Sequence, residues 1–211
     1  MQIFEQFEAQ FLEFINTEMT QDPAHDLSHV KRVVKTAKTL CIQENAELNI
    51  VVPAAYLHDC FTFAKDHPER AKSSVIAADK AVKLLESIGY PEKYFSAIHH
   101  AIMTHSYSAN ITPETLEAQI VQDADRLDSL GAIGIARCIQ VSTSFGSSLY
   151  NTEDPFCDSR VLNDKRYTID HFYNKLFKLE ALMNTQAAKT EANKRTQYMR
   201  AFLAQLECEI Y

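Results

Sequence analysis

Hydrophobic residues recur at intervals of three and four along most of the chain, which is the spacing of one face of an α-helix. In the N-terminal stretch 2–19, four phenylalanines fall on one such face. The same spacing predicts further helices in the ranges 28–41, 53–57, 69–88, 91–105, 114–143, 169–179 and 199–206. We therefore expect an all-α fold.

Local signals place several helix ends. Ser28 is a candidate cap for the second helix, and Pro53 suits the first turn of the third, strongly apolar one. Gly89 and Pro91 separate the fourth helix from the fifth.

A long polar stretch at 144–167 lacks periodicity, and connections of this length are usually functional or disordered. We interpret it as a lid or a substrate wall. The whole chain, 1–211, is then one domain. Its core covers about 20–145, and C-terminal helices at 168–210 pack on that core.

The composition of the chain argues against several classes of function. The chain has only 4 glycines and no GxGxxG or Walker pattern, which argues against Rossmann and P-loop enzymes. Its 21 basic and 28 acidic residues give a net charge of −7, which argues against nucleic acid and favours a small substrate over a long polyanion.

Cellular location follows from the cysteines and the N-terminus. The 5 cysteines are scattered and never spaced CxxC, as free thiols in a reducing cytoplasm would be. Glutamates interrupt the apolar N-terminal pattern, so no signal peptide is expected. No apolar run reaches the length of a membrane span.

The pair His58-Asp59 ends the apolar third helix. Burying two ionisable side chains there is costly unless they have partners, and a divalent cation suits both imidazole and carboxylate. The alternative is a histidine bonded to a carbonyl and an aspartate that caps a turn.

Two other segments carry similar chemistry. His29 lies on the buried edge of its helix, and His25 precedes it by four residues, so the two could chelate an ion; a lone core histidine is the alternative. Asp125 and Asp128 share one helix face beside apolar residues, although a charged helix start is also common.

The order His29, His58-Asp59, Asp125 resembles the HD-domain superfamily of metal-dependent phosphohydrolases, in particular its uncharacterised bacterial branch. The resemblance covers roughly residues 20–205. The strings that carry it are HVKRV at 29–33, AAYLHD at 54–59, AIMTHSYS at 101–108, QDADRLDSLGAIGIAR at 122–137, EDPF at 153–156 and DKRYTIDHFYNKLFKL at 164–179.

The resemblance implies an HD-fold helical bundle with a divalent ion: Mn, Mg, Ni, Co, Fe or Zn. The implied ligands are His29, His58, Asp59 and Asp125. His25 and Asp128 would then stand behind the ligands. His100 and His105 stand where many relatives have extra histidines. In some relatives these hold a second metal, and in others they act as acids toward the phosphoryl group.

The expected reaction is attack of a metal-activated water on phosphorus. Asp59 would orient the water, and His100 or His105 would protonate the leaving oxygen. The candidates for binding the substrate phosphate are Lys65, Arg126, Lys165 and Arg166, each of which could equally be a solvated surface residue.

The sequence therefore predicts a phosphohydrolase of a nucleotide or a similar small phosphorylated metabolite. Release of phosphate, release of pyrophosphate and opening of a phosphodiester all remain open, as does a homodimer. One alternative is a signalling module that binds a metal-nucleotide without turnover. The other is a di-iron oxygenase, which would engage more histidines.

Overall fold

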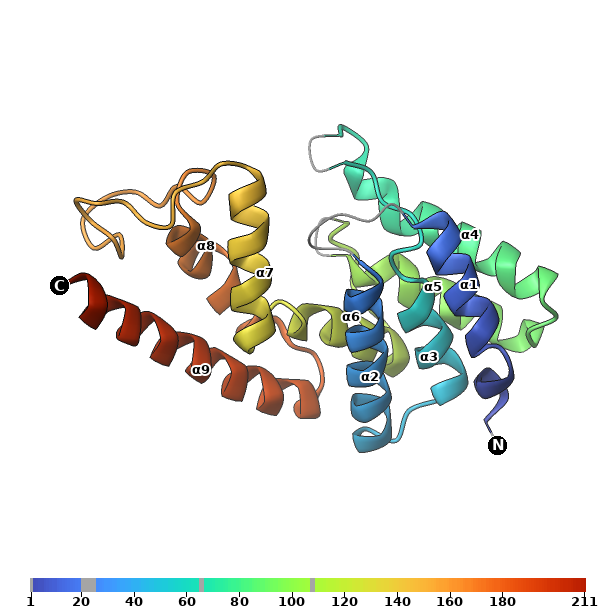
Figure 1. Cartoon of the computed structure of the whole chain (residues 1–211). Helices are drawn as coiled ribbons and strands as arrows, with labels where there is room; N and C mark the ends of the chain where they lie inside the picture. The colour runs from blue at the N-terminus through green and yellow to red at the C-terminus, as the bar shows by residue number, and fades with distance from the viewer. Residues whose placement is uncertain (1, 20–25, 65–66, 107–108) are drawn as a thin grey trace. The chain divides into compact units, whose positions relative to one another are not determined.

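The computed structural model describes residues 2–19, 26–64, 67–106 and 109–211. Within these ranges the secondary structure is helical, with one isolated bridge between Ser148 and Tyr167 and no strand. The all-α prediction is confirmed. The α-helices are α1 (Glu8–Glu18), α2 (Leu27–Gln43), α3 (Leu48–Leu57), α4 (Ser73–Ser87), α5 (Phe95–His105), α6 (Leu116–Leu127), α7 (Gly131–Ser144), α8 (Thr168–Asn174) and α9 (Gln186–Ile210) (Figure 1).

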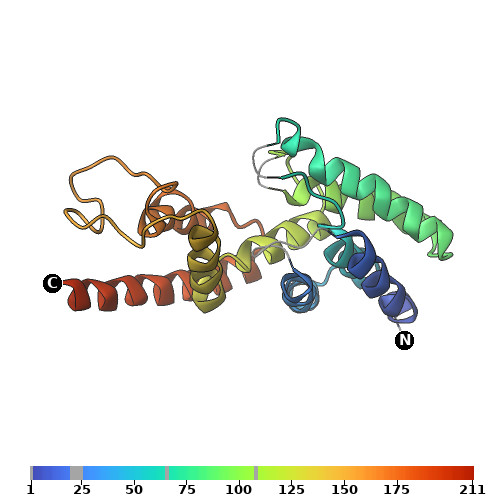
Figure 2. The same cartoon turned by 45° about the horizontal axis from the view of Figure 1, so that its top comes forward.

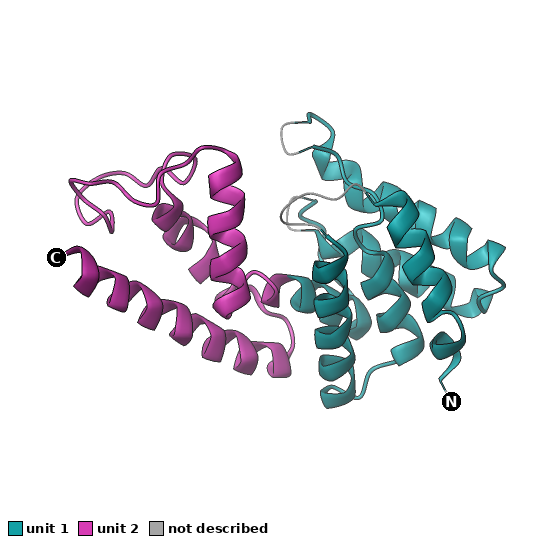
Figure 3. Cartoon of the chain, viewed as in Figure 1, with its two compact units in different colours: residues 1–125 teal, residues 126–211 magenta. Residues whose placement is uncertain are grey.

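The chain divides into two compact units, Met1–Asp125 and Arg126–Tyr211 (Figure 3). The border falls inside the last turn of α6. Packing of the C-terminal helices on the N-terminal core stays a prediction. None of the helices in the described ranges is both long and apolar enough to cross a membrane.

In the first unit, α3 occupies the centre. It packs against α2, α5 and α1, and α4 runs along α5 (Figures 1 and 2). Every residue of α3 from Val51 to Leu57 is buried. From α1, Phe11 and Ile15 are almost completely buried. The apolar segment read from the sequence is therefore the core helix that holds the other elements in place.

Two helix starts differ from the sequence prediction. α3 begins at Leu48 and not at residue 53, because the Glu47 side chain caps it by accepting a hydrogen bond from the amide of Asn49. Pro53 therefore lies inside the helix and not in its first turn. α2 is capped by Asp26 and not by Ser28.

Other predicted helices begin or end in short 3-10 turns. These turns cover Ile3–Gln6, Arg70–Lys72, Glu92–Tyr94, Leu176–Lys178 and Glu180–Leu182. The helical stretch expected at 114–143 consists of two helices, α6 and α7, separated by a turn. The last helix is much longer than its apolar markers suggested.

In the second unit, α7 packs along α9 and α8 packs on α7. The long polar loop that follows α7 is tied down by two carboxylates. Asp154 accepts hydrogen bonds from the amides of Asp158, Ser159 and Arg160. Buried Asp170 pairs with both terminal nitrogens of Arg160, each at 2.6 Å. The loop thus has a defined polar framework of its own.

Candidate metal centre

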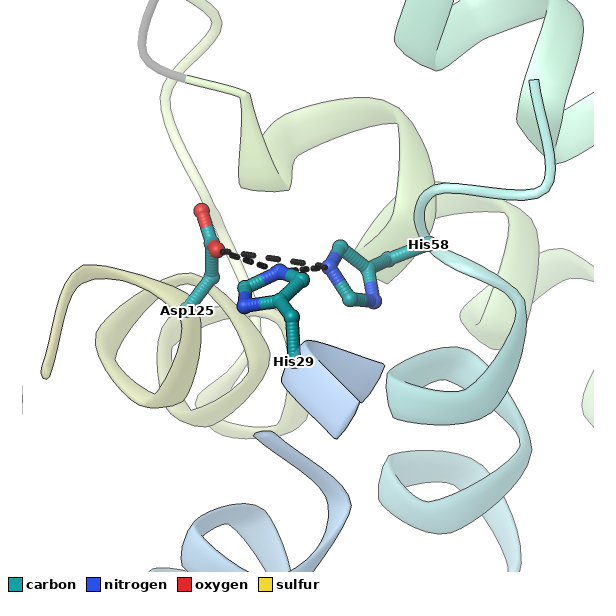
Figure 4. Close-up of side chains that lie close together, drawn as sticks. All are labelled: His29, His58 and Asp125. Atoms are coloured by element: carbon teal, nitrogen blue, oxygen red, sulfur yellow. Dashed lines mark hydrogen bonds and ion pairs between the residues drawn. The ribbon is translucent and has the colours of Figure 1, made fainter. Parts of the chain in front are cut away.

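Four elements of the first unit bring five side chains together. They are His29 from the first turn of α2, His58 and Asp59 at the end of α3, His105 at the end of α5 and Asp125 in the last turn of α6. Figure 4 shows three of them, His29, His58 and Asp125, pointing toward one another. Segments up to 96 positions apart in the sequence, His29 to Asp125, thus converge on one point.

The distances between these side chains fit a shared ion. His29 Nε2 lies 3.4 Å from Asp125 Oδ1, 3.6 Å from Asp59 Oδ2 and 3.4 Å from His58 Nε2. His58 Nε2 lies 3.4 Å from Asp59 Oδ2 and 4.0 Å from Asp125 Oδ1. Ligand atoms bound at about 2.1 Å to one ion stand roughly 3–4 Å apart, so little rearrangement is needed to bind one.

The main chain sets the protonation of two of the histidines. His58 Nδ1 lies 2.8 Å from the Ala55 carbonyl oxygen, and His105 Nδ1 lies 2.6 Å from that of Ile102. A carbonyl oxygen can only accept, so Nδ1 donates in both contacts. In the neutral ring, Nε2 then presents a lone pair to the cluster. Lone pairs and carboxylates that face one another at this range favour a bound cation.

The helix ends add to this preference. α3, α5 and α6 all end at the cluster, and a helix C-terminus carries partial negative charge. α2 approaches with its N-terminus, where the Asp26 carboxylate accepts from the His29 amide at 2.7 Å. The main-chain dipoles of three elements thus stabilise a positive charge at this position.

Asp59 uses its two oxygens in different directions. Oδ2 faces His29 and His58, whereas Oδ1 lies 3.5 Å from His105 Nε2. Burial alone would raise the pKa of Asp59, but His58, His105 and His29 hold it well below its ordinary value. Burial would likewise lower the pKa of His105, but its hydrogen bond and charge interaction with Asp59 raise it. Asp59 therefore stays ionised and links His105 to the other three residues.

Gln122 connects two of the helices that carry the site. It lies one turn before Asp125 on α6, and its buried side-chain amide donates to the Thr104 carbonyl oxygen at 2.7 Å. Thr104 directly precedes His105 on α5. The contact therefore fixes the spacing between the segments that carry Asp125 and His105.

The other predicted site residues lie elsewhere or outside the described ranges. His100 is half-buried, and its Nε2 accepts a hydrogen bond from the Glu114 amide at 3.0 Å. Asp128 pairs with Arg137 at 2.7 Å. His25 and Lys65 lie outside the described residues.

The three remaining basic candidates belong to the second unit. Lys165 and Arg166 are exposed, and Arg166 stacks over Tyr167. Arg126 donates to the Leu182 carbonyl oxygen. Their use for substrate phosphate stays a prediction.

Comparison with known proteins shows which family this chain resembles. The HD domain family matches residues 26–130. An uncharacterised Bacillus subtilis protein, YpgQ, is 31% identical over 194 residues, which are 90% of this chain and 86% of YpgQ.

Two solved structures are similar over nearly the full length. YpgQ in complex with ADP has a TM-score of 0.77 at 29% identity and covers 98% of this chain and 96% of its own. An HD-superfamily hydrolase from Bacillus thuringiensis has a TM-score of 0.75 at 34% identity, with coverage of 98% and 97%.

Proposed function

Because this chain belongs to the HD domain family, we propose that it is a metal-dependent phosphohydrolase of a nucleotide or a similar small phosphorylated metabolite. The observation that carries the proposal is the cluster of His29, His58, Asp59 and Asp125. Their ligand atoms face one another at 3.4 to 4.0 Å, with both imidazoles completely buried.

These four side chains are the proposed ligands of one divalent ion. When bound there, a divalent ion would lower the pKa of a water molecule toward neutrality and would polarise a phosphoryl oxygen. Imidazole and carboxylate together suit Mn, Fe, Co, Ni and Zn, whereas Mg prefers oxygen ligands. An ion that takes five or six ligands would still have room for water and substrate beside these four side chains.

Asp59 and His105 are the proposed proton-handling groups. Asp59 is ionised, so it can accept a hydrogen bond from the attacking water and orient it. His105 has a raised pKa and reaches the cluster through Nε2, so it can hold a proton there and donate it to the leaving oxygen. His100 is the weaker candidate, because its Nε2 already accepts from the Glu114 amide.

A nucleotide is the proposed substrate class. The similar structure of YpgQ is a complex with ADP, which supports binding of a nucleoside phosphate. The phosphate groups need cationic partners. Among the predicted ones we retain Lys65 and Lys165 as first candidates, with Arg126 and Arg166 after them.

The test is a metal and substrate screen on the purified protein. The protein is stripped with a chelator, reloaded with Mn²⁺, Mg²⁺, Ni²⁺, Co²⁺ or Zn²⁺, and assayed against nucleoside mono-, di- and triphosphates. Release of phosphate and pyrophosphate is measured separately. We expect hydrolysis that depends on the added ion and disappears with the chelator.

A variant pair sharpens this test. Asp59→Ala should lose the metal and the hydrolysis while its far-ultraviolet circular dichroism stays helical. Asp79→Ala is the matched control, because Asp79 is an exposed partner of His99 on α4. Full activity in Asp59→Ala would refute the metal mechanism. Binding of metal and nucleotide without turnover would instead favour the signalling module, and iron-dependent oxygen uptake the oxygenase.

A further inference from the structure

The C-terminal end of α6 is held by two arginines from later helices. Arg195 of α9 donates to the Leu127 carbonyl oxygen at 2.7 Å, and Arg137 of α7 donates to the Asp128 carbonyl oxygen at 3.1 Å. Arg137 also pairs with the Asp128 carboxylate. We refer to Arg137 and Arg195 as the arginine clamp.

The Leu127 carbonyl has two donors. The last four carbonyls of an α-helix have no amide donor in the regular helical pattern. Here the Ser129 and Leu130 amides close the end of α6 on the Arg126 and Leu127 carbonyl oxygens, each at 3.0 Å, and Arg195 adds a charged second donor to Leu127. In α6 that turn includes Asp125, a proposed metal ligand two residues before Leu127. A guanidinium at this end also interacts favourably with the partial negative charge of the helix C-terminus.

Arg195 is itself held in position from two sides. Its Nε donates to Glu191, one turn earlier on α9, at 2.7 Å. Its aliphatic stem lies against Gly131, where a Cβ atom would stand 3.2 Å from Arg195 Cγ. Gly131 has a φ of +72°, which also favours glycine. The sequence thus leaves room for the arginine stem.

We propose that Arg195 is a positioning residue for the metal centre. By adding a charged donor to the Leu127 carbonyl, it reinforces the main-chain bonds that close the last turn of α6 and so keeps the Asp125 carboxylate directed at His29 and His58. The inference rests on the proposed metal function. It adds that α9, which supplies no ligand, determines how well the ligand set is arranged.

The experiment compares Arg195→Met with Arg200→Met. Arg200 lies on the same helix and its guanidinium stacks on Phe177, so its loss removes a comparable cation without touching α6. Mn²⁺ affinity is measured by titration calorimetry, and ligand geometry by the visible absorption of the Co²⁺-loaded protein. Backbone hydrogen exchange is followed across residues 121–130.

We expect Arg195→Met to weaken Mn²⁺ binding by about 10-fold, the low end for partners that orient a ligand. Its Co²⁺ spectrum should change at full occupancy, and exchange at the end of α6 should accelerate. Arg200→Met should match the wild type in all three measurements. A merely structural role would lower the melting temperature and leave the Co²⁺ spectrum unchanged.

The outcomes separate this inference from the proposed function. If the wild type binds Mn²⁺ and Arg195→Met binds it equally well, Arg195 is not a positioning residue, and the proposed metal centre is unaffected. Wild-type protein that binds no divalent ion overturns both. If Arg195→Met does not fold, Arg195→Lys takes its place, because an ammonium cannot serve Glu191 and the carbonyl in the same fork geometry. Unchanged affinity in that variant overturns the proposal.

Discussion

Tyr90 donates its hydroxyl hydrogen to the Asn49 carbonyl oxygen at 2.7 Å, and this is the carbonyl that Pro53 leaves without an amide donor. Burial raises the pKa of Tyr90, so the hydroxyl stays protonated and remains a donor. A side chain from beyond α4 thus completes the hydrogen bonding of α3, the helix that ends in His58.

Tyr90→Phe should therefore destabilise the protein by about 1–3 kcal/mol, because it leaves a buried carbonyl unsatisfied. In a Pro53→Ala background the loss should be smaller, since alanine restores the amide donor. Urea unfolding of the wild type, both single variants and the double variant measures this coupling. Strictly additive losses would contradict the relationship.

Gln122→Met should reduce kcat by about tenfold or more, because the segments that carry Asp125 and His105 lose their common hydrogen bond. Gln119→Met is the control: its amide also donates to a carbonyl, that of Pro113, but the bond does not reach α5. Steady-state kinetics on the substrate found in the screen would decide it. A Gln122→Met rate equal to that of Gln119→Met would remove Gln122 from the positioning residues.

Gly134→Ala should cost about 3 kcal/mol, because the new Cβ would stand 2.3 Å from the main-chain oxygen of Ser129. Gly89→Ala provides a contrast. No atom lies within 4 Å of a Cβ placed there, and only its φ of +74° opposes the change, at roughly 1 kcal/mol. Denaturant unfolding measures both. Equal losses would show that the turn between α6 and α7 can move aside.

Asp154 gives a pH prediction. Hydrogen bonds from the amides of Ser159 and Asp158 lower the pKa of its carboxyl from 3.8 to about 2. A lowered native pKa means that the contribution to stability is complete above about pH 4 and is lost as the pH falls toward 2. Carboxyl carbon NMR should show this low midpoint. Asp154→Asn should lose the dependence and expose 154–160 to proteolysis; a midpoint near 3.8 would contradict the assignment.

The helices were predictable because their apolar positions follow one period over many residues. Their ends were less so. Pro53 was read as a helix start because that is its usual place, and the residue that makes an interior proline tolerable, Tyr90, lies 37 positions away. A contact of that separation leaves no mark in local spacing.

Only part of the site could be predicted from the sequence. The residue types and the resemblance to HD proteins were enough to predict His29, His58, Asp59 and Asp125 as metal ligands. Which of His100 and His105 lies beside Asp59 depends on helix rotation, and the structure places His105 there. Gln122 could have been noted as sharing a helix face with Asp125, but its partner is a carbonyl of another helix. Arg195 gave no signal, since surface arginines on long helices are common.

The Ala55 and Ile102 carbonyls make the orientation of two histidine rings insensitive to most side-chain substitutions. The partners that hold Nδ1 of His58 and His105, and so turn Nε2 toward the cluster, belong to the backbone. No substitution at position 55 or 102 that keeps the helix removes them. The tautomers can change only if the last turns of α3 and α5 unwind. Evolution can therefore vary the side chains behind these two histidines while Nε2 of each remains the nitrogen that faces the cluster.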